Sequence, residues 1–108
     1  MSEVDVFDAL KYRIEIDSFG VRRSYNAAGM LHHENAPAVV WPGGTKEWYQ
    51  TGLRHRTDGP AVEWSGGYKE YWVDGSYYYE SEFNAKFLNN LNGKIVEIDG
   101  KQYRLTAA

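Results

Sequence analysis

The sequence contains one 23-residue unit written twice without a gap, as residues 29–51 and residues 52–74. Ten of the 23 positions hold the same residue in both copies, and these positions include Gly, Pro, Trp, His, Lys and Glu. Self-similarity at a fixed period is the signature of repeat architectures, in which each unit covers the apolar face of the next. The duplication therefore predicts a stacked array rather than a globule folded around one central pocket.

Each copy of the unit predicts a β-hairpin. In the second copy, Pro60 opens a run that extends to Trp64, and Pro is tolerated at the first residue of a strand. Two glycines then supply a turn, and a second strand returns. We expect Ala61 and Glu63 to face solvent and the alternate residues to face the interior in both copies. The expected interior set is Pro37, Val39, Trp41, Pro60, Val62 and Trp64.

Eight residues at four equivalent positions are interpreted as structural marks of the unit. The glycines would supply the turns, with positive φ at Gly75, and the tryptophans would fill the interior. These residues are Gly43, Gly66, Gly52, Gly75, His32, His55, Trp41 and Trp64.

Residues 12–25 predict a degenerate third hairpin ahead of the two clear copies, with a turn at residues 17–20. Adding 23 to Gly20, Arg23 and Tyr25 leads to Gly43, Lys46 and Trp48. About three stacked units are normally needed for a stable array, and the terminal ones are usually atypical. The chain would therefore hold a minimal array.

After Gly75 the pattern changes from strand to helix. Residues 80–91 predict an amphipathic helix that has Ser81 or Glu80 as its N-cap, ends at Asn92-Gly93 and covers the open end of the hairpins. The apolar stripe of this helix is Phe83, Phe87, Leu88 and Leu91.

Residues 94–105 predict a terminal hairpin with a two-residue Asp99-Gly100 loop. This loop sets the register and places Val96 opposite Tyr103 and Ile98 opposite Lys101. Residues 2–11 predict a short helical turn.

The fold class that follows is mainly β: stacked antiparallel β-hairpin repeats of 23-residue period, with a C-terminal helix and a terminal hairpin. We expect residues 1–108 to form a single domain. Its parts are an N-terminal cap with a degenerate repeat (1–28), two repeats (29–51 and 52–74), a helical cap (75–93) and a C-terminal hairpin (94–108).

The glycines and aromatic residues of residues 29–75 resemble those of the MORN (membrane occupation and recognition nexus) repeat, whose 23-residue units are β-hairpins. Residues 54–64 and 69–75 also resemble a group of small proteins encoded by tailed bacteriophages and prophages. The first resemblance implies the hairpin-repeat fold. The second implies a viral protein that works in the host cytoplasm, where it would bind a host protein and inhibit a host-defence system by occlusion.

The histidines leave two interpretations open. His32 and His55 share one position of the unit and His33 lies beside the first, so a three-histidine metal site is one interpretation. The other, which we favour, is that each repeated His makes the same hydrogen bond in its own copy. The chain has no phosphate-binding glycine loop, HExxH motif or triad order, and charged neighbours such as Lys69 and Glu70 suit cross-strand pairing. We therefore expect no catalytic residue, no metal and no cofactor.

Aromatic residues make up 16% of the chain and supply the candidates for protein binding. Tyr and Trp anchor interfaces because they bury large areas with few rotatable bonds. The candidates are Trp48, Tyr71, Trp72, Tyr77, Tyr78 and Tyr79. The alternative for the three successive tyrosines is that they complete the core where hairpin and helix meet. The alternative function is a MORN-like contact with lipid or carbohydrate.

Charge and composition narrow the partners. The net charge of −3, with acidic and basic residues interleaved, indicates no nucleic-acid partner. The absence of cysteine excludes disulfides and Cys-based zinc sites. No signal peptide and no run of 18 apolar residues is present, so we expect a cytoplasmic protein without a membrane contact. An exposed sheet edge leaves homodimerisation open.

Overall fold

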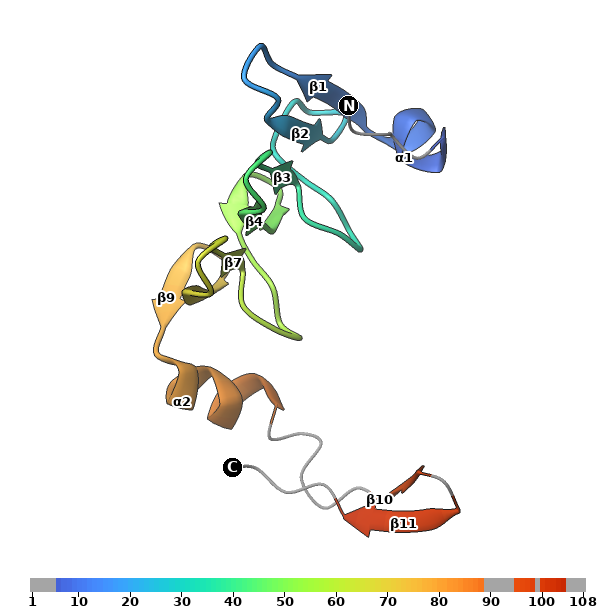
Figure 1. Ribbon diagram of the computed structural model, residues 1–108, viewed down its shortest axis with the longest axis vertical. Coiled ribbons are helices and arrows are strands. Elements are labelled where there is room, and N and C mark those ends of the chain that lie inside the picture. The colour runs from blue at the N-terminus through green and yellow to red at the C-terminus, as the bar shows by residue number, and fades with distance from the viewer. Residues whose placement is uncertain (1–5, 89–94, 99, 105–108) are drawn as a thin grey trace.

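The computed structural model describes residues 6–88, 95–98 and 100–104, and this part of the chain is mainly β (Figure 1). Antiparallel strands form a sheet, and a short helix follows them. The elements are α1 (Val6–Lys11), β1 (Arg13–Ile16), β2 (Arg22–Tyr25), β3 (Val39–Val40), β4 (Lys46–Glu47), β5 (Tyr49–Gln50), β6 (Leu53–Arg54), β7 (Val62–Glu63), β8 (Lys69–Val73), β9 (Ser76–Tyr78), α2 (Glu80–Phe83), the π-helical segment η1 (Asn84–Leu88), β10 (Ile95–Ile98) and β11 (Lys101–Arg104).

The main sheet has seven strands in the order β1-β2-β3-β4-β7-β8-β9, and every neighbouring pair is antiparallel. Strands β5 and β6 follow β4 in the chain and form a separate two-stranded hairpin. Strand β10 pairs with β11. The molecule is elongated, with extents of 47 × 32 × 29 Å, and the strands follow one another along its long axis (Figure 1). Each strand of the main sheet therefore contacts its neighbours instead of a common centre.

Several backbone hydrogen bonds recur 23 residues along the chain. The Trp41 N–H donates to the Thr45 carbonyl at 2.9 Å, and the Trp64 N–H donates to the Tyr68 carbonyl at 2.9 Å. Inside these turns the residue with positive φ is Gly44 (107°) and its counterpart Gly67 (98°). The preceding glycines, Gly43 and Gly66, have ordinary φ, whereas Gly52 and Gly75 turn with φ of 83° and 79°.

The hairpin of β1 and β2 aligns with the hairpin of β3 and β4 at an offset of 24 residues, not 23. Arg22 pairs with Val40 as Lys46 pairs with Glu63, so Arg22 corresponds to Lys46. The prediction that aligned Arg23 with Lys46 is wrong by one residue, as are those for Gly20 and Tyr25. The reason is the turn at residues 26–29, which has one residue more than its counterpart before Gly52, and this insertion restores the 23-residue spacing at Gly29.

The prediction that Ala61 faces solvent is wrong. Ala61 and its counterpart Ala38 are 0% and 1% exposed, whereas Trp41 and Trp64, expected inside, are 40% and 45% exposed. Each alanine is bonded on both sides, since the Trp48 N–H donates to the Ala61 carbonyl and the Ala61 N–H donates to the Glu70 carbonyl. Both alanines therefore lie in the interior of the sheet. Val39 and Val62 are buried as expected.

The C-terminal helix begins at Glu80, and its N-cap is Tyr79. The expected caps, Glu80 and Ser81, lie inside the helix instead. The Glu82 carboxylate reaches back to accept the Tyr79 N–H at 3.0 Å, which satisfies a donor that the helix leaves free. Buried Phe83 packs on Tyr71 at 4.8 Å between ring centres, so the helix covers the last strands of the sheet. Residues 89–94, which include the expected helix end, lie outside the described residues.

The terminal hairpin has the predicted register. Val96 pairs with Tyr103, and Ile98 pairs with Lys101. Gly100 has the positive φ of 77° that this short loop requires. At the other end, helix α1 covers residues 6–11 of the expected helical turn, and residues 2–5 lie outside the described part.

Candidate interaction surface

Two glutamates at the same position of the repeated unit hold aromatic side chains in place. The Glu47 carboxylate accepts the Trp41 Nε1–H at 2.8 Å and the Tyr49 hydroxyl at 3.0 Å. The Glu70 carboxylate accepts the Trp64 Nε1–H at 2.7 Å. It also accepts a second indole, the Nε1–H of Trp72, at 2.9 Å.

The hairpin produces this geometry. The residue six positions before each glutamate lies across the tight turn, and the residue two positions after it lies on the same face of the strand. Each carboxylate therefore binds one aromatic side chain from across the turn and one from its own side of the hairpin.

Arg54 joins the two carboxylates. Its guanidinium donates to Glu47 at 3.3 Å and lies 3.9 Å from the Glu70 carboxylate. It also lies over the Trp72 ring at 5.2 Å. Burial lowers the pKa of Arg54. Contacts with the Tyr49 hydroxyl and the Glu47 carboxylate raise it by more, so the pKa lies above its ordinary value. Burial and the neighbouring Glu47 charge likewise raise the pKa of Tyr49.

Five aromatic residues near the C-terminal side of the sheet form a partly exposed surface, which we call the aromatic face. The Tyr77 ring meets Trp72 edge-on at 5.4 Å and Tyr79 edge-on at 5.8 Å. Partial burial and, to a smaller extent, the neighbouring Tyr68 phenol raise the pKa of Tyr77. Trp64 joins the group through the Glu70 carboxylate that it shares with Trp72.

Most of this surface is open to solvent. Tyr77 is 47% exposed, Tyr68 64% and Tyr79 68%, while Trp72 is half-buried. The members of the aromatic face are Trp64, Tyr68, Trp72, Tyr77 and Tyr79.

The structure divides the six predicted binding residues among three places. Trp72, Tyr77 and Tyr79 lie on the aromatic face. Tyr71 and Tyr78 pair across β8 and β9 and point to the opposite side, where the helix covers them.

Tyr71 contacts Phe83 and donates its hydroxyl to Glu80 at 3.1 Å, and Tyr78 meets Phe87 at 5.4 Å. These two tyrosines complete the packing against the helix. Trp48 lies apart, beneath the Arg56 guanidinium at 4.0 Å. The sequence interpretation assigned Glu47 and Glu70 to cross-strand charge pairing and did not foresee that both bind indole groups, although they occupy an identical position of the repeated unit.

The repeated histidines make the same hydrogen bond. The Nδ1 of His32 accepts the Thr51 N–H at 3.0 Å, and the Nδ1 of His55 accepts the Asp74 N–H at 3.0 Å. Both donor residues have positive φ, 51° for Thr51 and 49° for Asp74. Each histidine therefore holds a left-handed turn residue of the following hairpin.

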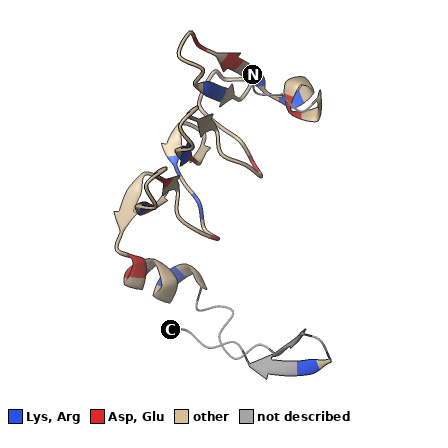
Figure 2. Cartoon of the chain, in the orientation of Figure 1, with Lys and Arg blue, Asp and Glu red and all other residues tan. Residues whose placement is uncertain are grey.

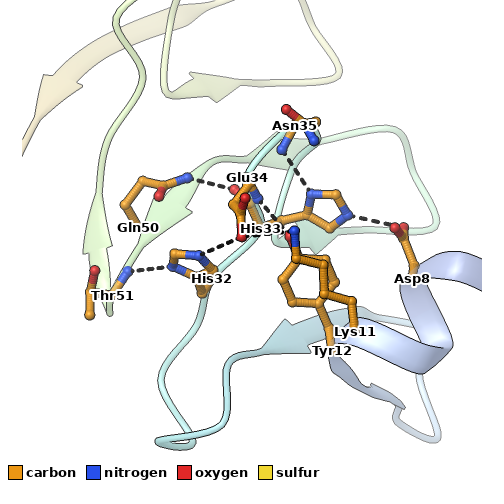
Figure 3. Close-up of polar contacts among 9 residues, drawn as sticks. All are labelled: Asp8, Lys11, Tyr12, His32, His33, Glu34, Asn35, Gln50 and Thr51. Carbon is orange, nitrogen blue, oxygen red and sulfur yellow. Dashed lines mark hydrogen bonds and ion pairs between the residues drawn. The ribbon is translucent and has the colours of Figure 1, made fainter.

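His33 has a different environment, at the junction of α1 with the sheet (Figure 3). Its Nδ1 accepts the Asn35 N–H at 3.1 Å, so Nε2 carries the proton and donates to the Asp8 carboxylate at 3.0 Å. The side chain is 6% exposed and packs on Tyr12 at 4.5 Å. Both ring nitrogens are engaged, and across the described residues no group of three His, Cys, Asp or Glu side chains is placed to hold a metal ion.

An open groove of about 720 Å³ lies over Trp48, between residues 34–37 and 55–58. Its basic residue, Arg56, is engaged by Asp58 at 2.9 Å, by Glu63 at 3.2 Å and by the Pro60 carbonyl at 3.1 Å. The guanidinium is therefore neutralised by the chain itself and does not offer an anion site.

Charges of both signs are interspersed along the ribbon from α1 to η1 (Figure 2). In the part of the chain that the structure describes, no helix has the length and apolar character needed to cross a membrane. Comparisons of the chain with protein-family models, curated proteins and solved structures gave no significant match.

Proposed function

We propose that this chain is a non-enzymatic binding module built from stacked β-hairpins of 23-residue period, and that the aromatic face is its contact surface for another protein. The recurrence of the bonds at Trp41 and Trp64, and of those at His32 and His55, supports the repeat architecture. The sequence resemblance to bacteriophage proteins makes a bacterial host protein, such as a defence protein inhibited by occlusion, the expected partner.

The fixed positions of the exposed aromatic rings carry this proposal. Trp64 and Trp72 are held by the Glu70 carboxylate, and Tyr77 is held between two other rings. A side chain that is already ordered loses less conformational entropy on binding. Tyr and Trp are also the residues that most often dominate binding energy. A rigid, half-exposed aromatic surface suits recognition of a protein better than it suits the anionic head groups of lipids.

The polar side chains support a function other than catalysis. Glu47 and Glu70, at the same position of the two copies, bind indole groups, and His33 has both ring nitrogens engaged. A general acid or base needs a proton-exchanging atom that can reach a substrate. The cytoplasmic location expected from the sequence belongs to the same proposal.

Affinity capture with matched variants tests the proposal. The tagged chain would be incubated with bacterial lysate, and the retained protein would be identified, purified and titrated against Tyr79→Ala and Tyr77→Ala. We expect Kd to rise at least about tenfold in each variant. The control is Phe19→Ala, since Phe19 is 83% exposed at the far end of the sheet.

Equal losses in the control and in the two tyrosine variants would contradict a contact at the aromatic face. Vesicles containing anionic lipid and a panel of oligosaccharides would be titrated in parallel. Tight binding to either one, with no protein retained, would favour the MORN-like lipid or carbohydrate alternative.

A further inference from the structure

The main sheet has two edge strands, β1 and β9. Strand β9 leads directly into the helix that covers the end of the sheet. The outer edge of β1 is paired with no other strand in the described parts of the chain and lies at the end of the strand series (Figure 1). An unpaired edge presents N–H and C=O groups that can accept another strand.

The pairing of β1 with β2 determines which backbone groups face outward. The Asp17 N–H donates to the Val21 carbonyl, so Asp17 faces β2, and the alternation of an antiparallel pair gives Glu15 and Arg13 the same direction. Ile14 and Ile16 therefore direct their N–H and C=O groups away from the sheet. Consistent with this, Ser24 opposite Ile14 directs its N–H away from β1 and donates to the carbonyl of Ala38, the residue before β3.

The sequence of β1 is complementary to itself. Arg13 and Glu15 lie on one face of the strand, joined at 2.7 Å, and their side chains are 58% and 52% exposed. If two copies of β1 run antiparallel with Ile14 opposite Ile14, each Arg13 lies opposite the other copy's Glu15. A twofold axis makes this favourable pairing occur twice.

We infer that β1 pairs antiparallel with β1 of a second copy of this chain, about a twofold axis at Ile14. Each Ile14 N–H donates to the Ile14 carbonyl of the other copy, and each Ile16 N–H donates to the other copy's Tyr12 carbonyl. The Tyr12 N–H takes no part because it already donates to Asp8 at 2.8 Å. Four backbone bonds and two pairs of opposite charges join the two sheets.

The charges select this register over its neighbours. An axis at Arg13 or at Glu15 places two like charges directly opposite each other. An axis at Ile16 places Glu15 opposite Asp17, again with like charge. The register at Ile14 also brings Ile16, which is 46% exposed, opposite Tyr12 at the end of α1. This inference goes beyond the proposed function and uses no residue of the aromatic face.

Charge reversal in the full-length chain tests the inference. Sedimentation velocity and light scattering over a range of protein concentrations should give a mass that approaches twice the 12.4 kDa of one chain. Arg13→Glu and Glu15→Arg should each weaken the dimer about tenfold or more, because both symmetry-related pairs become repulsive. The double variant Arg13→Glu with Glu15→Arg restores opposite charges and should restore the dimer.

Lys101→Glu is the matched control, since it changes the net charge as much as Arg13→Glu on exposed Lys101 of β11. Far-UV circular dichroism would establish that each variant is folded. A wild-type chain that stays monomeric at every concentration would overturn the inference. So would a dimer that persists in both single variants, or a double variant that stays monomeric while the control forms dimers.

Discussion

Replacing Glu70 by glutamine changes one oxygen to an amide group of nearly the same size. The Glu70 carboxylate accepts two indole N–H groups, Trp64 at 2.7 Å and Trp72 at 2.9 Å. An amide has only one oxygen, and its NH₂ group cannot accept a hydrogen bond. Trp64 binds Oε2 and Trp72 binds Oε1, so in Glu70→Gln one of the two indoles loses its acceptor and faces the NH₂ group.

The magnitude follows from the kind of bond that is lost. A hydrogen bond to a charged group contributes about 1.5 to 3 kcal/mol. The Glu70 side chain is 16% exposed, but Trp64 is 45% exposed and water can replace part of its bond. We therefore expect the free energy of unfolding to fall by about 2 kcal/mol, which lowers Tm by on the order of 10 °C for a domain of this size.

The repeated unit supplies its own rescue variant. At the position of Trp72 the preceding copy has Tyr49, whose hydroxyl can donate or accept. In Glu70→Gln with Trp72→Tyr the hydroxyl can accept from the amide, so the double variant should lose less stability than the two single changes summed.

Urea unfolding followed by tryptophan fluorescence measures the wild type, the two single variants and the double variant. The control is Glu34→Gln, at a carboxylate that is 49% exposed and paired with Lys11 at the surface, where an ion pair contributes little. If Glu70→Gln unfolds at the wild-type urea concentration, or if the double variant shows simple additivity, the explanation of the Trp–Glu contacts is refuted.

Three further outcomes are expected. Thr51→Gly should stabilise the fold by about 0.5 kcal/mol in thermal unfolding, because a β-branched residue at φ 51° is strained, whereas Asp74→Gly should change little since Asp tolerates this conformation. Ala61→Leu should destabilise by about 1 to 3 kcal/mol in urea, because Ala61 is 0% exposed; a neutral effect would contradict its burial. Arg23 and backbone N–H groups hold the pKa of Asp17 below its ordinary value of 3.8, so the stability from this group is present above 3.8 and is lost as pH falls through the lower folded pKa. Asp17→Asn should flatten the acid limb of the urea midpoint measured against pH.

The sequence predicted the features that local chemistry determines. The Asp99-Gly100 loop gave the register of β10 with β11, because a two-residue turn fixes which residues are opposite. The glycines at positions 52 and 75 were expected at turns, and both have positive φ. The antiparallel β character and the following helix were predicted from alternation and helical spacing. These features depend on a few adjacent residues.

Other features depend on contacts between distant segments and were predicted incorrectly or not at all. Alternation separates the two faces of a strand but does not say whether either face is open to solvent, and Ala61, on the face that was expected to be exposed, is 0% exposed. The pairing of Trp64 with Glu70 requires a specific turn that brings residues six positions apart together. The extra residue in the turn at 26–29 shifts the alignment of the first hairpin, and no spacing rule within residues 12–25 indicates it.

The position of Arg54 between Glu47 and Glu70 has a consequence for the order in which the molecule opens. Each carboxylate belongs to a different hairpin, and the same guanidinium serves both. Release of either hairpin alone would leave a charge in a partly buried place with one partner fewer, so partial opening between them is penalised. Amide protons on the two hairpins should therefore exchange with deuterium at closely similar rates, as one cooperative unit rather than as an array that frays strand by strand.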